Sequence, residues 1–259
     1  MLKQQNPHPR DLSITMDVKN HQYWLSYNDK TKNKPLLSVT QYVKTLFPIF
    51  CPKQTIQNMK KKQNWDKSKY YNMTDTEIMK QWDDVRNKAV KMGTLMHKNI
   101  ENFYNKKDYD IHTKEFNQFN QFCIDHKDLI PWRTEMMIWD DTIGLGGTVD
   151  MIFKTNDKKI VIFDWKRSKQ IRIHNYFNKF ASHPLMKDVP DTNYWHYCIQ
   201  LNIYRWILEK NYYPNQMSDE MYIVVFHENN HSYKKFKIKD MRHIIDKLLN
   251  DRIRYQKLD

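Results

Sequence analysis

Glycine is scarce in this chain of 259 residues, which contains only Gly93, Gly144, Gly146 and Gly147. An average composition at this length would supply about 18 glycines. The sequence therefore has neither a Gly-x-Gly-x-x-Gly turn nor a Gly-x-x-x-x-Gly-Lys loop, which excludes Rossmann and P-loop nucleotide sites. Because glycine adopts positive φ at little cost, each of the four is expected where the backbone has a special need.

Cysteine and long apolar runs are also lacking. Cys51, Cys123 and Cys198 are odd in number and far apart, which fits reduced thiols and argues against a disulfide framework or a paired-cysteine zinc site. The chain has no run of about 18 apolar residues, and its first residues lack the apolar stretch of a signal peptide. We therefore expect an intracellular protein that does not insert into a membrane.

Positive charge, in contrast, is in excess, because 43 lysines and arginines face 30 acidic residues and give a net charge of +13. Such an excess is common in proteins that bind nucleic acids, whose affinity is dominated by phosphate contacts. A solvated surface encoded by an A+T-rich genome explains it equally well. The 40% hydrophobic and 14% aromatic content is enough for one domain with additions, or for a large and a small lobe.

Hydrophobic periodicity predicts mainly helices in the first half of the chain, after a loose tail over residues 1–10 and a hairpin of strands 12–18 and 23–27. Capping boxes at Ser38 and Thr74 predict a short helix up to Leu46 and a long helix. The apolar stripe of the long helix is expected to lie in the core; it consists of Met79, Trp82, Val85, Ala89, Met92, Met96, Ile100 and Phe103.

The periodicity changes after Pro131. Strands are predicted over 132–139, 148–154, 160–165, 221–226 and 233–238, with helices over 116–123, over 194–208 and from Asp240. This order predicts an α/β or α+β fold with a central mixed sheet flanked by helices. We expect residues 1–92 to form a hairpin and helical region that packs on a core of residues 93–259.

Two aspartates and a lysine stand out in this part of the chain. Asp150 lies in one predicted strand and Asp164 ends the next, so a turn over 155–158 can bring both carboxylates to the same end of the sheet. Lys166 follows Asp164 by two residues and therefore faces the same side of the strand. Burying two carboxylates together is unfavourable unless a cation neutralises them, and Mg²⁺ or Mn²⁺ would do so.

Each of these residues alone is more simply explained as a strand-end or surface residue. The combination is more informative, because the apolar strand Ile160–Phe163 runs directly into Asp-Trp-Lys, where packing gives no reason for charge. A metal bound there would activate water and polarise a phosphodiester, while the lysine would stabilise the charge that develops.

Four short motifs extend this pattern. They are Gly-Thr-x-x-His at Gly93–His97, Gly-Thr-Val-Asp at Gly147–Asp150, Asp-Trp-Lys at Asp164–Lys166 and Gln-x-x-x-Tyr at Gln200–Tyr204. Their order and spacing resemble the PD-(D/E)XK nucleases, and specifically the branch that includes the RecB nuclease domain and the mitochondrial genome maintenance exonucleases. The resemblance covers residues 93–204 and implies a restriction-endonuclease-like core.

The resemblance also implies roles for the matching residues. Asp150, Asp164 and Lys166 would be catalytic, and the metal would be held by His97, Asp150, Asp164 and the backbone carbonyl of Trp165. A histidine in this position, taken without the family, is more often structural.

Further residues are assigned supporting roles. Glu101 lies one helical turn after His97 and would orient it or assist metal binding, and Glu135 either matches an acidic residue of several relatives or is a solvent-facing strand residue. Gln200 and Tyr204 share a helix face and are expected to point toward the active site or contact DNA, or else to form part of an amphipathic core rim. The remaining nucleic-acid-binding candidates are Arg167 and Lys169.

The expected function is a Mg²⁺- or Mn²⁺-dependent DNA nuclease, and more specifically an exonuclease, of recombination, repair or replication-end processing, from a large DNA virus or another A+T-rich genome. A viral source would place it in the host cytoplasm, the nucleus or the virion. Three isolated cysteines cannot hold the iron–sulfur cluster of some relatives, and unwinding would need a helicase or recombination partner chain. The alternatives are a cap-snatching-like RNA endonuclease and a non-catalytic nucleic-acid-binding module.

The four glycines all flank proposed catalytic residues. Gly93 precedes His97 by one helical turn, and the other three precede Asp150. We therefore expect a Gly147→Val substitution to impair cleavage more than it impairs folding.

Overall fold

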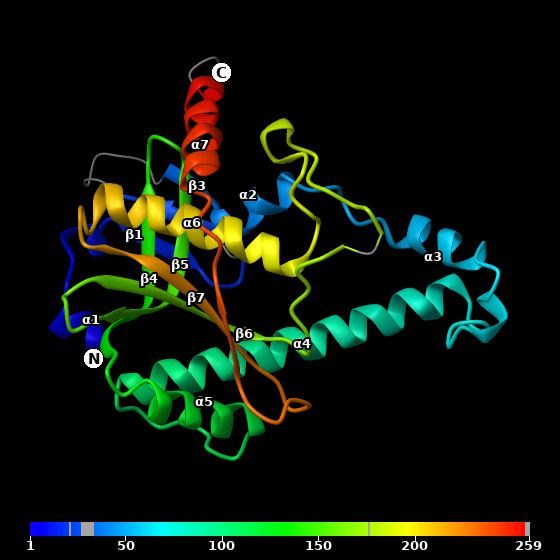
Figure 1. Cartoon of the computed structure of the whole chain (residues 1–259), viewed down its shortest axis with the longest axis horizontal. Coiled ribbons are helices and arrows are strands. Elements are labelled where there is room, and N and C mark those ends of the chain that lie inside the picture. Colours follow the sequence, from blue (N-terminus) through cyan, green and yellow to red (C-terminus); the bar gives the residue numbers. More distant parts are fainter. Residues whose placement is uncertain (21, 27–33, 176, 257–259) are drawn as a thin grey trace.

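A computed structural model of the chain describes residues 1–20, 22–26, 34–175 and 177–256 (Figure 1). The strands are β1 Ile14–Asp17, β2 Gln22–Leu25, β3 Lys34–Ser38, β4 Ile130–Asp140, β5 Leu145–Lys154, β6 Ile160–Arg167, β7 Met217–Phe226 and β8 Lys234–Lys237. The α-helices are α1 Leu2–Gln5, α2 Val39–Thr45, α3 Pro52–Lys60, α4 Asp75–Tyr104, α5 Lys114–Asp125, α6 Asn193–Asn211 and α7 Arg242–Gln256. Three short 3-10 helices are η1 Pro9–Leu12, η2 Trp65–Lys67 and η3 Pro184–Met186.

The described strands form one mixed sheet in the order β1-β2-β3-β5-β6-β7-β8, and β4 pairs with β5. β3 runs parallel to β5 and β6 runs parallel to β7, whereas the other pairs are antiparallel. The predicted mixed sheet flanked by helices is thus confirmed at the level of fold class. The sequence prediction missed β3 and α3.

The sheet separates two hydrophobic clusters. On β6, Ile160 and Ile162 belong to the cluster that includes buried residues of α2, α6 and α7. The alternate residues Val161, Phe163 and Trp165 belong to the other cluster, with α5 and the C-terminal half of α4. This alternation is the period of two that a strand buried on both faces requires.

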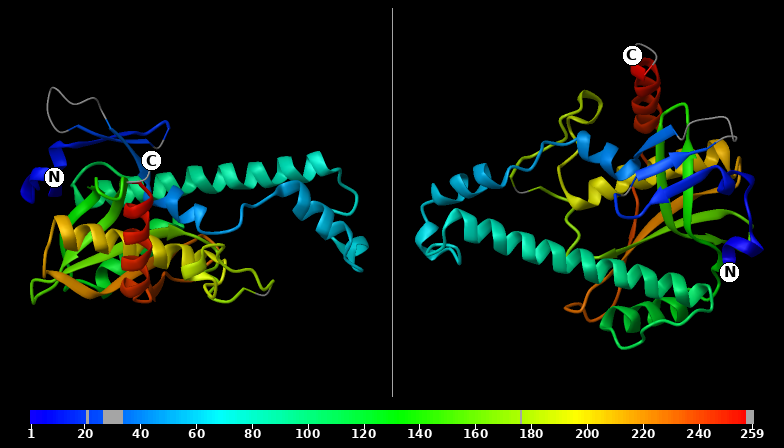
Figure 2. Two further views of the ribbon diagram at one scale, coloured as in Figure 1. Left: turned by 90° about the horizontal axis from the view of Figure 1, so that it is seen from above. Right: turned by 180° about the vertical axis from the view of Figure 1, so that it is seen from behind.

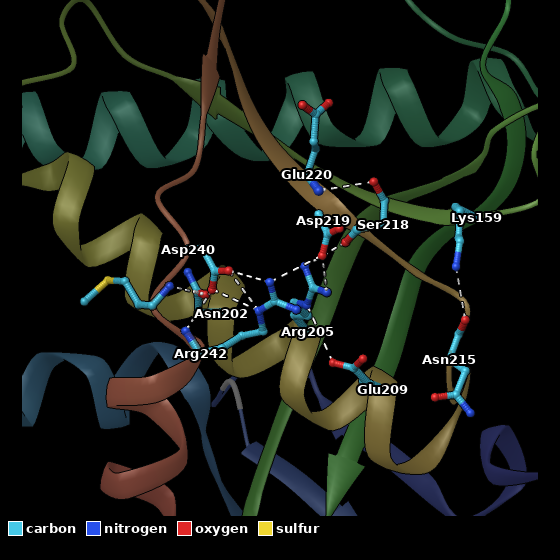
Figure 3. A network of polar contacts seen from close by, with 11 residues as sticks. Lys159, Asn202, Arg205, Glu209, Asn215, Ser218, Asp219, Glu220, Asp240 and Arg242 are labelled. Carbon is cyan, nitrogen blue, oxygen red and sulfur yellow. Dashed lines mark hydrogen bonds and ion pairs between the residues drawn. The ribbon is translucent and has the colours of Figure 1, made fainter.

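A polar network fastens α6 to β7 and to the start of α7 (Figure 3). The buried guanidinium of Arg205 donates to the carbonyl of Ser218 at 2.7 Å and contacts Asp219 at 3.5 Å. Asn202 donates to the carbonyl of Lys239 at 2.9 Å and accepts from the backbone N–H of Met241 at 2.9 Å. These bonds hold α6 in place against the sheet, and α6 is the helix that lies next to the candidate site.

The N-terminal residues are ordered rather than a loose tail, so that prediction was wrong. The guanidinium of Arg10 lies 3.4 Å from the ring centroid of Trp139 and donates to its carbonyl at 2.9 Å. Arg133, only 1% exposed on β4, forms a two-bond ion pair with Asp11 in which both distances are 3.0 Å. A buried arginine needs such a partner, which the tail supplies.

The long helix is confirmed, but only its C-terminal part belongs to either hydrophobic cluster, and the buried Ile78 near its start belongs to neither. Met96 and Ile100 are buried, whereas Val85 is 65% exposed and Ala89 is exposed. Figure 2 shows the reason, because α3 and the first half of α4 extend together away from the sheet as an arm. The periodic stripe predicted an amphipathic helix correctly. It could not show that the first half of α4 extends beyond the sheet.

The hairpin prediction is confirmed for β1 and β2, while His21 and Tyr27 lie outside the described residues. The expected division between residues 92 and 93 falls inside α4, which is continuous there. Moreover, β3 from the N-terminal region pairs with β5 at the centre of the sheet. In the described part of the chain, no helix is long and apolar enough to cross a membrane.

Candidate metal centre

The hairpin of β5 and β6 brings the two predicted aspartates together. The register that pairs Met151 with Phe163 places Asp150 opposite Asp164 one step further along. Directly opposite residues point to the same face of a sheet. Asp150 also accepts a hydrogen bond of 2.8 Å from the backbone N–H of Trp165, which fixes its carboxylate beside β6.

Three side chains from three elements converge at this point. Nδ1 of His97 on α4 lies 3.6 Å from Oδ2 of Asp150 and 3.6 Å from Oε1 of Glu135 on β4. Ligand atoms of all three residues lie within 4.8 Å of one another. An octahedral Mg²⁺ with bonds of about 2.1 Å holds its ligands about 3–4 Å apart, so the spacing suits this ion.

Glu135 reaches the cluster through an unusual backbone conformation. Its φ is +45°, in the left-handed region that a non-glycine residue rarely adopts, although it lies within a strand. The pairs Thr134–Met151 and Met136–Val149 place it directly across from Asp150. Strained residues of this kind persist where the surrounding structure holds them, and they often re-aim a side chain at a functional site.

Lys166 and Asp164 form the second half of the site. Nζ of Lys166 lies 2.5 Å from Oδ2 of Asp164, and it lies 4.8 Å from the ring centroid of Tyr197 on α6. Asp164 is 1% exposed, and its Oδ1 has no hydrogen-bond partner among the described residues. A buried carboxylate oxygen without a partner is costly, and a cation or a metal-bound water would satisfy it.

Burial and mutual charge shift the ionisation of every member of the site. Burial raises the pKa of Asp164 to about 6 against the opposing effect of Lys166, and it also raises the pKa of Asp150. For His97 burial lowers the pKa, but Asp150 and Glu135 outweigh it and raise the pKa to about 9. The two aspartates likewise overcome burial and raise the pKa of Lys166.

The charge balance of the centre calls for a divalent cation. With three carboxylates ionised, Lys166 protonated and His97 neutral, the centre would carry a charge of −2. In the metal-free protein, a proton on His97 compensates part of this charge. The residues that would hold Mg²⁺ or Mn²⁺ are His97, Glu135 and Asp150, because oxygen donors with an imidazole suit both ions. Lewis-acid activation of water is the chemistry that such an ion would supply.

The predicted ligand set therefore changes in two ways. Asp164 is not part of the converging triad, because its carboxylate pairs with Lys166. Glu135 belongs to the triad, whereas the sequence predicted either a supporting residue or a solvent-facing strand residue. For Trp165, the structure shows that its backbone N–H supports Asp150 and that its side chain is buried, whereas the proposed ligation by its carbonyl stays a prediction.

Gln200 and Tyr204 lie beneath the site rather than on a surface that DNA could contact. They are 7% and 3% exposed, and Gln200 donates a hydrogen bond of 3.0 Å to the Tyr204 hydroxyl. A residue that the sequence missed, Tyr197, lies on the same helix face and covers Lys166. Its spacing of three residues before Gln200 and seven before Tyr204 was the signal that could have found it.

Arg167 and Glu101 have partners that remove them from their predicted roles. The buried guanidinium of Arg167 contacts Glu115 at 2.7 Å and Glu228 at 2.9 Å, so it ties α5 to the end of β7. Glu101 pairs with Lys98 at 2.8 Å and does not join His97 in the cluster. Lys169 is exposed, which leaves its ammonium accessible to a ligand.

No protein-family model and no curated protein matches the chain. A solved structure titled "Crystal structure of SSO0001" is 14% identical and has a TM-score of 0.35. The match covers 88% of this chain and 80% of that chain. A TM-score this low does not establish a shared fold.

Proposed function

We propose that this protein is a divalent-metal-dependent DNA nuclease of the PD-(D/E)XK type. The observation that carries the proposal is the meeting of His97, Glu135 and Asp150 beside the buried pair of Asp164 and Lys166. This arrangement combines a set of oxygen and imidazole ligands with a protonated amine that is held in place. The four motifs of the RecB-like branch and the net charge of +13 support the same function.

The residues of the site have separate tasks in this proposal. His97, Glu135 and Asp150 would hold the cation, which would supply Lewis-acid polarisation of the scissile phosphate. The ammonium of Lys166, held by Asp164, stabilises the negative charge that develops on the phosphate oxygens during hydrolysis. Asp164 is thus a positioning residue for Lys166 as well as a carboxylate that can contact a metal-bound water.

Cleavage of DNA with Mg²⁺ or Mn²⁺ tests the proposal. The purified protein should degrade DNA, and Lys166→Ala or Asp150→Asn should lower the rate by about 100-fold or more. Lys127→Ala and Asp128→Asn are matched controls, because both residues are exposed and lie between α5 and β4, outside the cluster. Equal cleavage by the site variants and the controls would overturn the proposal.

The substrate is tested in the same assay. Circular and end-labelled linear DNA separate endonuclease from exonuclease action, and we propose an exonuclease, which needs a free end. RNA of the same length tests the alternative of an RNA endonuclease. A folded protein that binds DNA but cleaves neither substrate would instead be a non-catalytic binding module.

A further inference from the structure

A cavity of about 630 Å³ lies between the end of β6 and the start of α6. Its wall is formed by parts of the segment 168–193 and by His196, and it begins at Ser168, two residues after Lys166. Two residues of a strand span about 7 Å, so the cavity opens close to the candidate metal centre.

The cavity is basic. Lys169, Arg172 and Lys179 line it, are exposed, and have no carboxylate within ion-pair distance in the described part of the chain. Asp191 is the acidic residue of the wall, and His196 contacts its Oδ1 at 2.8 Å. Three cations that lack an internal partner and face a common space form a site suited to phosphate groups.

The backbone around the cavity is held in place by hydrogen bonds. The N–H of Arg172 donates to the Asn193 side chain at 2.8 Å, and the Asn175 side chain donates to the carbonyl of Asp191 at 2.7 Å. The N–H of Asp191 in turn donates to the carbonyl of Lys179 at 2.9 Å. The cations are therefore carried by an organised segment, which lowers the entropic cost of binding a ligand.

An aromatic ring completes the wall. Phe177 lines the cavity and is 69% exposed, so its ring is accessible to a ligand in the cavity. Nζ of Lys62, near the end of α3, lies 5.5 Å from its ring centroid. The arm of α3 and α4 thus reaches the same segment and adds a fourth cation beside the ring.

We infer that this cavity binds a single strand of DNA that flanks the scissile phosphate, with phosphates on Lys169, Arg172 and Lys179 and one unpaired base on Phe177. An exposed ring beside cations is the combination that single-strand-binding sites use, because every base has a face that can stack. Bases in a duplex already stack on one another. The inference rests on the proposed nuclease function for its location, but its test does not require cleavage.

The test is binding of a fluorescent single-stranded oligonucleotide in EDTA, which prevents cleavage. We expect the triple variant K169Q/R172Q/K179Q to bind at least about tenfold more weakly. The slope of log K against log[salt] should become shallower by about 2. Phe177→Ala should weaken single-strand binding about fivefold or more and leave duplex binding nearly unchanged. The matched control K107Q/K127Q/K247Q removes the same charge from other exposed positions.

The outcomes separate the possibilities. Equal losses in the triple variant and its control would show a general charge effect and overturn the inference, as would unchanged binding by the triple variant. Equal losses of single-strand and duplex binding in Phe177→Ala would overturn the role of the ring. If the unmodified protein does not cleave DNA but the variants show the expected binding losses, the nuclease function is refuted. The inference that the cavity binds single-stranded DNA then still stands. Circular dichroism spectra confirm that each variant is folded.

Discussion

The ring of Tyr204 occupies the space that a side chain on Gly147 would need. A Cβ atom at Gly147 would lie 2.5 Å from Cε1 and 3.1 Å from the hydroxyl oxygen of Tyr204. This glycine therefore lets α6 approach β5 closely next to Asp150. The expectation that Gly147→Val would affect cleavage more than folding changes accordingly, because the substitution must displace a buried ring.

Gly147→Ala should destabilise the protein by about 1–3 kcal/mol, the usual cost of overpacking. Gly93→Ala is a matched comparison, since α4 is continuous through it and, apart from its chain neighbours and the nearby helix backbone, no atom of the described residues lies within 4 Å of a Cβ built there. That change should stabilise the helix by about 1 kcal/mol. Urea denaturation measures both, and a Gly147→Ala variant as stable as the unmodified protein would contradict the packing described.

Loss of the Asp11 carboxylate should be costly as well. Asp11→Ala leaves the buried guanidinium of Arg133 without its ion-pair partner, and we expect a loss of about 3–5 kcal/mol. The double variant D11L/R133M removes both charges and should recover most of that loss. Thermal unfolding of the three proteins tests this, and equal losses in the single and double variants would show that the unpaired guanidinium is not the source of the loss.

The metal-free protein should lose stability between about pH 6.5 and pH 9. Folding raises the pKa of His97 to about 9, so its protonated form stabilises the folded state; this contribution is complete below about pH 6.5 and lost as the pH rises through 9. Urea denaturation in EDTA measures it, and His97→Gln should flatten this part of the profile. An unchanged profile in the variant would contradict the assignment.

Metal binding should show the opposite pH dependence. A cation must displace the proton of His97, so Mn²⁺ affinity should increase as the pH rises toward 9. Calorimetry at several pH values in buffers of different ionisation enthalpy would detect the released proton. Affinity that is independent of pH over this range would show that His97 is not a ligand.

The sequence predicted the strand pair that carries Asp150 and Asp164 because alternation and turn residues are local signals. Two features of the site depend on distant parts of the chain and were not readable in this way. The position of Glu135 depends on a left-handed backbone conformation within β4. The burial of Arg167 depends on Glu115 and Glu228, which are far away in the sequence.

The arm illustrates the same limit for the fold. The periodicity of α4 is continuous from Met79 to Phe103, but Val85 is exposed, because this part of the helix extends beyond the sheet. A hydrophobic stripe shows which face of a helix is apolar. It does not show how much of that face is covered by the sheet against which the helix packs. The Lys169 assignment, by contrast, needed only an exposed position after the strand, and the structure leaves that residue accessible.

The most direct test of the central claim is a crystal structure of the protein with MnCl₂, with anomalous data collected to locate manganese. We predict a peak in coordination contact with Nδ1 of His97, a carboxylate oxygen of Glu135 and a carboxylate oxygen of Asp150, and its loss in Asp150→Asn. A well-ordered site with no manganese peak at saturating concentration, or a peak bound by other residues, would contradict the account.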